Sequence, residues 1–278
     1  MIYSWQLART LARYMVVNKW NGRKRFPTVM MLEPNFNCNL ACAGCGRIRQ
    51  NADNLNDMLT AGQCLASVEE AQPPVVSITG GEPLLHPEIK RIVEGIVAQK
   101  RFVYLCTNGL LLRSFLPKVR PSPYLGFVVH LDGLAPTHEG ITGRPGLFEM
   151  ALNAIRAAKQ AGFQVRTNTT VYKSTDPQEL VELFTLLGRL GVDGMMVAPA
   201  FSYEQVNSNI FLSRQEAVAA FQPIYAQRTK FRFYNTPVYL DFLAGRRTLQ
   251  CTPWSTPTRD PNGWKTPCYL LTDGYYRT

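Results

Sequence analysis

Three cysteines lie close together near the start of the chain. Cys38, Cys42 and Cys45 have the spacing C-x3-C-x2-C in the segment NFNCNLACAGCGR. Thiolates are soft ligands for zinc ions and iron–sulfur clusters, and clusters usually take four of them. Three protein ligands on a 4Fe-4S cluster leave one iron open to an outside ligand, as in catalytic metal sites. The spacing predicts a catalytic iron–sulfur site, with a zinc ion completed by a distant Cys or His as the alternative.

Three further segments place glycine and polar residues directly after β-branched runs. They are Gly80-Gly81-Glu82-Pro83, Cys106-Thr107-Asn108-Gly109 and His130-Leu131-Asp132-Gly133. A Gly-Gly pair after a strand permits a tight turn and a close approach of a ligand to the backbone. Catalytic groups of α/β barrels gather at the C-terminal ends of the strands. We therefore expect these segments and the cysteines to share one barrel mouth.

The pattern that positions them alternates short β-branched runs with longer amphipathic stretches, which is typical of βα units around a parallel sheet. The predicted strands are 28–33, 75–79, 102–106, 125–131, 164–171 and 193–198. The predicted helices between and after them are 59–71, 87–99, 111–117, 147–161, 177–190 and 213–228. A closed TIM barrel has eight such units, so six predict an open, partial (β/α)6 TIM-like barrel.

The chain divides into three predicted parts. Residues 1–27 contain a basic amphipathic helix over 4–20, residues 28–230 form the barrel, and residues 231–278 form an extension. The extension is rich in Pro, Gly, Trp and Tyr with little periodicity, which predicts a loop-rich region folded against the barrel mouth.

Composition and charge limit the location and the partners. At 278 residues and 46% apolar composition the chain can bury a full core, and 30 Lys and Arg against 20 Asp and Glu give a charge of +10. This charge suggests an anionic partner or only a basic surface. Seven cysteines, three of them clustered, favour a metal site in a reducing cytosol over disulfides. No signal peptide or membrane span is predicted, which indicates a cytoplasmic location.

The N-terminal helix has two interpretations. Its apolar residues Leu7, Leu11, Tyr14 and Met15 recur at three- and four-residue steps, and no acidic residue precedes Glu33. Such a basic helix can lie on an anionic membrane surface, which would place the protein at the inner face of the membrane. Alternatively, it covers the bottom of the barrel with its basic face in water.

The cysteine triad after the first strand, together with GGEP at 80–83, resembles the radical S-adenosylmethionine (SAM) superfamily. The resemblance implies a 4Fe-4S cluster on Cys38, Cys42 and Cys45, with SAM bound through its methionine moiety at the open iron. It implies SAM contacts from Gly80, Gly81, Glu82, Pro83, Thr107, Asn108, His130, Asp132 and Asn168, with Arg166 as either a contact or a strand residue. Relatives usually have an aromatic residue before the third cysteine, near the adenine. This chain has Gly44, so we expect the adenine contact to come from elsewhere.

Longer strings, among them MLEPNFNCNLACAGCGRI, PVVSITGGEPLLHPEI and CTPWSTPTRDPNGWKTPCYLLTDGYY, resemble the adenosylhopene synthase family of hopanoid biosynthesis. The implied reaction adds the 5′-deoxyadenosyl radical to the alkene of diploptene, a membrane triterpene, to form adenosylhopane. It requires an electron donor such as flavodoxin or ferredoxin. It also requires membrane access, which the basic N-terminal helix and the aromatic extension would supply.

The addition leaves a tertiary carbon radical that must receive a hydrogen atom. Cys106 is the predicted donor because a thiol S–H bond is weaker than an alkyl C–H bond, and the alternative is a cysteine that packs as a small apolar side chain. Cys251 and Cys268 resemble the opening of an auxiliary-cluster extension, but two thiolates do not complete a cluster. Family members continue for some tens of residues, so we expect a truncated extension or one without a second cluster.

Two other functions remain open at this point. One is a radical SAM peptide maturase with an auxiliary cluster, suggested by the spacing of Cys251 and Cys268. It predicts a leader-peptide-binding domain, for which 27 residues before the first strand are too few. The other is a non-catalytic iron–sulfur or nucleic-acid-binding protein, suggested by the charge. Because the basic residues cluster at the N-terminus instead of sharing a face with aromatic residues, no nucleic acid is expected.

Overall fold

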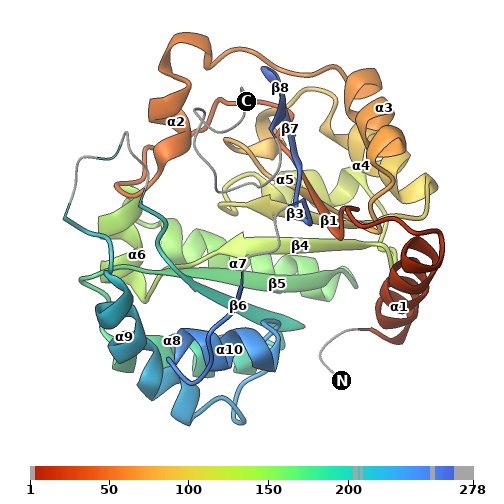
Figure 1. The fold of residues 1–278 in the computed structure, drawn as a ribbon. Helices are drawn as coiled ribbons and strands as arrows, with labels where there is room; N and C mark the ends of the chain where they lie inside the picture. Colours follow the sequence, from red (N-terminus) through yellow and green to blue (C-terminus); the bar gives the residue numbers. More distant parts are fainter. Residues whose placement is uncertain (1–3, 203–205, 207–208, 251–253, 266–278) are drawn as a thin grey trace.

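An eight-stranded, mostly parallel sheet forms the centre of the molecule (Figure 1). The computed structural model describes the chain except residues 1–3, 203–205, 207–208, 251–253 and 266–278. The strand order is β6-β5-β4-β3-β2-β1-β7-β8. The strands are β1 (Val29–Leu32), β2 (Val75–Ile78), β3 (Phe102–Thr107), β4 (Leu125–His130), β5 (Gln164–Val171), β6 (Gly194–Pro199), β7 (Thr258–Asp260) and β8 (Gly263–Lys265).

Helices follow most of the strands and cover the outer face of the curved sheet (Figure 1). They are α1 (Trp5–Trp20), α2 (Gly46–Gln50), α3 (Ala61–Ala71), α4 (Ile89–Ala98), α5 (Leu112–Phe115), α6 (Ala135–Thr142), α7 (Leu147–Gln160), α8 (Pro177–Arg189), α9 (Arg214–Ala226) and α10 (Pro237–Leu243), with short 3-10 turns at Ala52–Asn54, Pro83–Leu85 and Leu116–Lys118. The neighbouring strands β1 to β6 pair in parallel. The predicted partial α/β barrel is confirmed.

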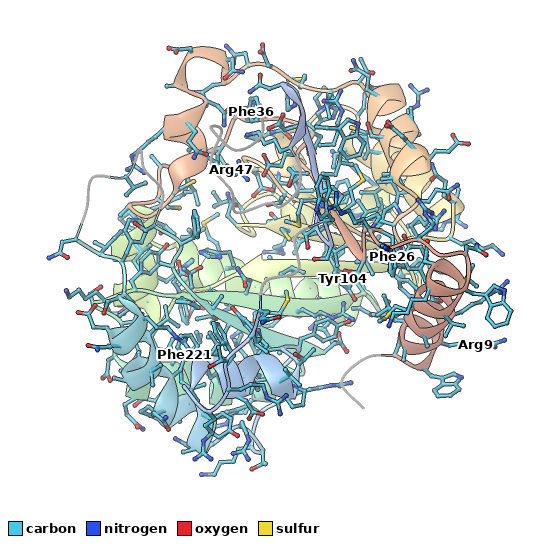
Figure 2. The ribbon with its side chains drawn as sticks, in the orientation of Figure 1. Arg9, Phe26, Phe36, Arg47, Tyr104 and Phe221 are labelled. Carbon is cyan, nitrogen blue, oxygen red and sulfur yellow. The ribbon has the colours of Figure 1, made fainter. Side chains whose placement is uncertain are left out.

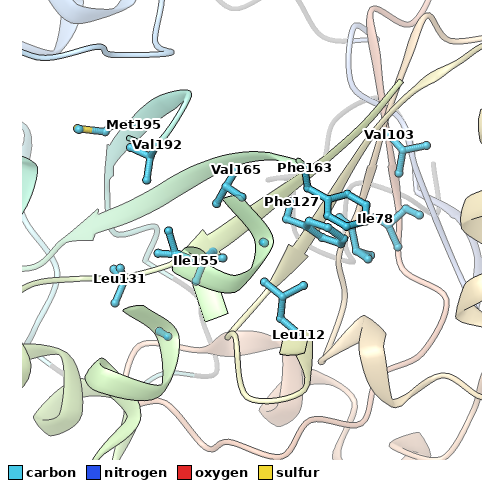
Figure 3. Close-up of a cluster of buried hydrophobic side chains, with 14 of the residues drawn as sticks. Ile78, Val103, Leu112, Phe127, Leu131, Ile155, Phe163, Val165, Val192 and Met195 are labelled. Atoms are coloured by element: carbon cyan, nitrogen blue, oxygen red, sulfur yellow. The ribbon is translucent and has the colours of Figure 1, made fainter. Parts of the chain in front are cut away.

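The main core lies between the sheet and this helical layer. Phe127 of β4 packs edge-on against Phe163, with ring centroids 5.1 Å apart, and Leu112 and Ile155 lie in the same cluster (Figure 3). Because side chains alternate along a strand, the residues between these apolar ones point to the concave face. That alternation directs Cys106, His130, Arg166 and Asn168 into the barrel.

The C-terminal region adds elements that the sequence did not predict. β7 pairs in parallel with the outer edge of β1, and β8 returns antiparallel to β7. The short helix α10 precedes these strands and was not predicted. Outside this region, the short helices α2 and α6 were not predicted either. Three-residue strands and helices of five to eight residues are too short to establish a hydrophobic period, which explains why they were missed. Cys251 and Cys268 lie outside the described residues.

Helix α1 closes the end of the barrel where the strands begin. Its Leu7 is buried against Val75 and Phe102, the first residues of β2 and β3, and against Tyr234. The helix therefore covers the bottom of the barrel, as the second interpretation of this segment expected. In the described residues, no helix combines the length and the apolar character that crossing a bilayer requires.

Above this cover, Arg166 fills the lower part of the barrel. Its guanidinium carbon lies 4.8 Å from the ring centre of Tyr104 and 4.4 Å from that of Tyr234, so two cation–π contacts hold it. Gly126 leaves room for the guanidinium, because a Cβ there would overlap Nη1. Arg166 is thus part of the barrel floor.

Candidate active site

The cysteine loop follows β1 at the C-terminal edge of the sheet. Cys45 is the N-cap of α2, its N–H donates to the Cys42 carbonyl at 3.1 Å, and Arg49 donates to the Cys45 carbonyl. A buried ion pair between Arg47 Nη2 and Glu33 Oε1, 2.9 Å long, joins α2 to the end of β1. Figure 2 shows Arg47 and Phe36 at this end of the molecule, far from α1. The loop is therefore fixed at both ends.

The three thiols of this loop are free and half-buried. The pKa of Cys38 rises to about 11 and that of Cys42 to about 12, mainly because of burial, with a smaller contribution from the neighbouring Cys45 thiol. Among the described residues, no group of three or more His, Cys, Asp or Glu side chains is close enough to hold one metal ion. A 4Fe-4S cluster distributes its protein ligands over different irons, so separated thiols on one loop fit a cluster better than a single zinc ion.

The GGEP segment packs directly against the cysteine loop. Gly81 N–H donates to the Asn35 carbonyl at 3.1 Å, and Glu82 N–H donates to the Asn37 carbonyl at 2.9 Å. A Cβ at Gly81 would overlap the Asn37 carbonyl, and Gly80 has a φ of +107°, so both positions require glycine. The two glycines allow the GGEP backbone to pack closely against the backbone of residues 35–37. The sequence had suggested a close approach of a ligand as the reason for the Gly-Gly pair.

The Glu82 carboxylate connects this segment to the third motif. Oε1 accepts from Thr107 Oγ1 at 2.8 Å and from Leu84 N–H at 3.1 Å, and Oε2 accepts from Asn108 N–H at 2.9 Å. Burial raises the pKa of Glu82 to about 7, although these three hydrogen bonds lower it. Glu82 therefore acts within the protein as a buried anchor for Thr107 and Asn108.

Asn108 extends this network back to the cysteines. Its Nδ2 donates to Asn39 Oδ1 at 2.7 Å, and Asn39 directly follows Cys38. The network thus positions the cysteine loop, GGEP and the end of β3 as one unit.

A second polar group, formed by His130, Asp132 and His138, lies at the C-terminal end of β4. His130 Nε2 is 2.7 Å from Asp132 Oδ2, and Asp132 Oδ1 accepts from Thr170 N–H at 2.8 Å. Burial lowers the pKa of His130, but the Asp132 carboxylate raises it more, so the net shift is upward. Asp132 is fully buried, which makes it a support for His130, and the partly exposed His130 is the member that faces the mouth.

His138 on α6 completes this group and was not predicted. Its Nδ1 accepts from the Asp132 N–H at 3.2 Å. Burial lowers the pKa of His138 to about 4, so it is neutral near pH 7 and its proton is on Nε2.

Cys106 and Asn168 occupy the concave face near these groups. Cys106 Sγ lies 3.5 Å from Ser77 Oγ on the adjacent strand, and the Cys106 side chain is partly exposed. Asn168 pairs in register with His130 and is half-buried. Both therefore lie on the side of the sheet that the mouth motifs surround.

Gly44 has a structural explanation that lies far away in the sequence. The ring of Tyr172, just after β5, occupies the space beside Gly44, and any Cβ at position 44 would overlap ring atoms of Tyr172. Relatives usually carry an aromatic residue directly before the third cysteine, where this chain has Gly44. In this chain the Tyr172 ring lies beside that position instead. No local sequence signal identifies Tyr172, whereas the asparagines of NFNCNL at 35, 37 and 39 stand out beside the cysteines.

We expect Gly44→Ala to displace Tyr172 or the cysteine loop, because both are packed. The free energy of unfolding should fall by about 1–3 kcal/mol, the usual effect of overpacking. Thermal unfolding and iron content after reconstitution measure this. Gly140→Ala on the nearby α6 is the control, since nothing lies within 4 Å of a Cβ there. Equal effects of the two substitutions would contradict the role assigned to the Tyr172 contact.

Fold and site together define an open parallel α/β barrel with a three-cysteine loop and an interlocked GGEP segment at its mouth. The family model of the radical SAM superfamily matches residues 32–187, and the chain belongs to this superfamily, whose enzymes use a 4Fe-4S cluster and SAM. A second model, a domain of unknown function (DUF3463), matches residues 195–278.

Known relatives differ in their activities. The chain is 32% identical over 170 residues to the AdoMet-dependent heme synthase of Methanosarcina barkeri, which covers 59% of this chain and 48% of that protein. It is 28% identical over 170 residues to the mycofactocin maturase MftC of Mycobacterium tuberculosis, which covers 59% of this chain and 43% of that protein. The chain thus spans less than half of either relative.

Solved structures share the fold. The crystal structure of Streptococcus suis SuiB bound to S-adenosylmethionine superposes with a TM-score of 0.73 at 17% identity, covering 93% of this chain and 64% of that one.

Proposed function

We propose that this chain is a radical SAM enzyme that adds the 5′-deoxyadenosyl group of SAM to the alkene of diploptene. In this proposal Cys38, Cys42 and Cys45 hold the cluster. When bound, the 4Fe-4S cluster supplies the electron for reductive cleavage of SAM to methionine and the 5′-deoxyadenosyl radical. Glu82 and Asn108 hold the cysteine loop and the end of β3 in fixed positions, and the neighbouring Thr107, His130 and Asn168 line the SAM site.

The observation that carries the proposal is the environment of Cys106. Its thiol lies on the concave face, one residue before Thr107, which Glu82 fixes in place. Burial raises the pKa of Cys106 to about 11, so the thiol keeps its hydrogen at neutral pH. A protonated thiol inside a radical enzyme is suited to hydrogen-atom donation, whereas a thiolate is not.

The reaction balances with this donor. The π bond of the alkene breaks as one of its electrons forms a carbon–carbon bond with the radical carbon, and the other electron stays on the tertiary carbon as a radical. The Cys106 S–H bond then breaks and a C–H bond forms, which leaves a sulfur radical. One electron and one proton restore the thiol, with the electron supplied by a carrier such as flavodoxin or ferredoxin.

The substrate assignment rests on the likeness of the mouth motifs and of the segment 251–276 to the adenosylhopene synthase family. Diploptene is nonpolar and dissolves in membranes, so the proposal also requires a cytoplasmic protein with peripheral membrane contact. The DUF3463 match begins within β6 and includes Tyr234, whose ring contacts Arg166 in the barrel floor. In this proposal, the region matched by DUF3463 helps to shape the interior of the barrel that receives the substrate.

The test is an anaerobic reaction of the iron- and sulfide-reconstituted protein with dithionite, SAM and detergent-solubilised diploptene. Mass spectrometry follows 5′-deoxyadenosine and adenosylhopane. Adenosylhopane formation is the expected result. 5′-Deoxyadenosine without a lipid adduct would reject diploptene as the substrate of this chain while leaving the radical SAM chemistry in place.

Cys106→Ala separates the hydrogen-donor role from cluster binding. We expect the variant to keep its iron content and SAM cleavage but to form adenosylhopane at least about 10²-fold more slowly, a loss of the size seen when a positioned proton-transferring side chain is removed. Ser77→Ala is the matched control, because it removes the 3.5 Å neighbour and leaves the thiol. Unchanged adenosylhopane formation by Cys106→Ala would assign Cys106 a packing role.

A peptide maturase is the second candidate. Two findings favour it: the relative MftC is named a maturase, and the fold neighbour SuiB has been crystallised bound to the precursor peptide SuiA. In the same assay, SAM cleavage stimulated by a peptide and not by diploptene would support this candidate.

A further inference from the structure

Helix α1 has two apolar faces, of which the barrel uses one. Leu7, Leu11, Tyr14 and Asn18 follow the three- and four-residue spacing of a single helix face, and this face is turned toward the protein. Leu7 and Asn18 are buried, and Leu11 packs on the cluster around Val75 and Phe102. The apolar face that the sequence suggested for a membrane is therefore mostly occupied by the barrel.

The opposite face carries a second apolar stripe. Trp5, Val16 and Trp20 lie about 180° away from Leu7 around the helix, at the 100° per residue that an α-helix turns. Their exposures are 70%, 65% and 88%. The helix thus exposes an indole at each end and a valine between them. Such a stripe is unusual on a surface that faces water, because burying these apolar side chains would be favourable in free energy.

Basic residues surround this stripe. Arg9 and Arg13 lie on the same outer side as the stripe, Lys19 flanks its other edge, and α1 contains no acidic residue. Figure 2 shows Arg9 extending from α1 away from the barrel. Arg9 and Arg13 also line a shallow groove of about 430 Å³ along the helix, together with Gln6, Thr10, Tyr14 and Val17. Guanidinium groups beside exposed indoles match a surface that is anionic outside and apolar just beneath.

We propose that α1 docks through the stripe Trp5–Val16–Trp20 onto a lipid bilayer with anionic headgroups. Indole rings favour the membrane–water interface, and arginines bind lipid phosphates at the same depth. A protein partner would need acidic groups around an apolar groove, whereas a bilayer supplies both features over the whole length of the helix.

The docked orientation follows from the fold. α1 covers the strand beginnings, while the cysteine loop lies at the strand ends, so the two occupy opposite ends of the barrel (Figure 1). A bilayer under α1 therefore leaves the mouth open to SAM and to a water-soluble electron donor. This proposal does not depend on the identity of the substrate.

The test is co-sedimentation of the full, cluster-reconstituted chain with vesicles of phosphatidylcholine alone or mixed with phosphatidylglycerol. We expect binding to the mixed vesicles and at least about tenfold weaker binding to the neutral ones, because each basic residue near an anionic surface strengthens binding about fivefold. Arg9→Glu with Arg13→Glu should weaken binding to the mixed vesicles by about 10–30-fold or more. Trp5→Ser, Val16→Ser and Trp20→Ser together should weaken it at least tenfold.

Lys90→Glu with Arg91→Glu is the matched control, since it reverses two exposed basic side chains on α4, outside the docking surface, and should leave binding close to that of the parent chain. The stripe variants keep Leu7 and Asn18, so circular dichroism and SAM cleavage should match the parent chain. Equal binding by parent and stripe variants would overturn the proposal. So would sedimentation equilibrium showing that the stripe holds two copies of the chain together in the absence of lipid.

Discussion

Cys42→Ala is expected to abolish both cluster content and SAM cleavage. Cys42 lies in the middle of the triad, and two remaining thiolates on the loop cannot hold three irons. Because groups that act as one unit lose nearly all function when one is removed, 5′-deoxyadenosine formation should fall by about 10³-fold or more. Iron and sulfide content, visible absorbance and 5′-deoxyadenosine yield after anaerobic reconstitution measure this effect.

Cys64→Ala provides the matched control for the loss of a thiol. Cys64 is fully buried in α3 within the main core and has no part in the loop. Its truncation should leave iron content unchanged and lower the free energy of unfolding by about 1 kcal/mol, as expected for a small core truncation. If Cys42→Ala kept a full complement of iron, another residue would have to be a cluster ligand and the triad assignment would be wrong.

Glu82→Gln is expected to change how stability depends on pH. The pKa of Glu82 rises from its ordinary 4.5 to about 7 on folding, so between these values the folded state binds a proton that the unfolded state has released. The free energy of unfolding therefore falls as pH rises from about 4.5 to 7, by about 3 kcal/mol from this group. Glutamine has no proton to lose, so this part of the pH dependence should disappear.

The same substitution also disturbs the network at the mouth. Glutamine offers one carbonyl oxygen to three donors, from Thr107, Leu84 and Asn108, and turns an NH2 toward one of them. At pH 5 the variant should be less stable by about 1–3 kcal/mol, the penalty of an unpaired buried donor. SAM cleavage should fall by about 10–100-fold, as for other supporting residues of metal sites.

Urea unfolding between pH 4.5 and 7.5 measures both effects on stability. Glu94→Gln is the control, because Glu94 on α4 has a half-exposed side chain that lies 3.9 Å from Lys90. It should leave the pH slope as in the parent chain. A Glu82→Gln variant with the parent's pH slope would show that burial does not shift the proton affinity of Glu82.

Hydrogen bonds between the segments around the mouth determine the shape of this site. Asn35, Asn39 and Glu82 bind the segments to one another, and Asp132 supports His130 from a buried position. Binding side chains held by such partners keep their geometry without rearranging when a ligand arrives. Variants of these residues should therefore reduce activity by disturbing the geometry of the mouth.

The sequence by itself determined the six main strands, their helices and the cysteine triad. These features are local, because hydrophobic alternation and the spacing of thiols can be recognised within ten to twenty neighbouring residues. It also indicated that GGEP and the segments after β3 and β4 meet at one mouth, since parallel strands end at the same edge of a sheet.

Only the tertiary structure decided the contacts between distant segments. It placed Tyr172 beside Gly44, joined β7 to the free edge of β1, and directed the Glu82 carboxylate to Thr107 and Asn108. It also selected which apolar face of α1 covers the barrel and which remains exposed. Such contacts depend on which side chains fill a shared volume after the chain has folded, and residues far apart in sequence carry no periodic signal of that packing.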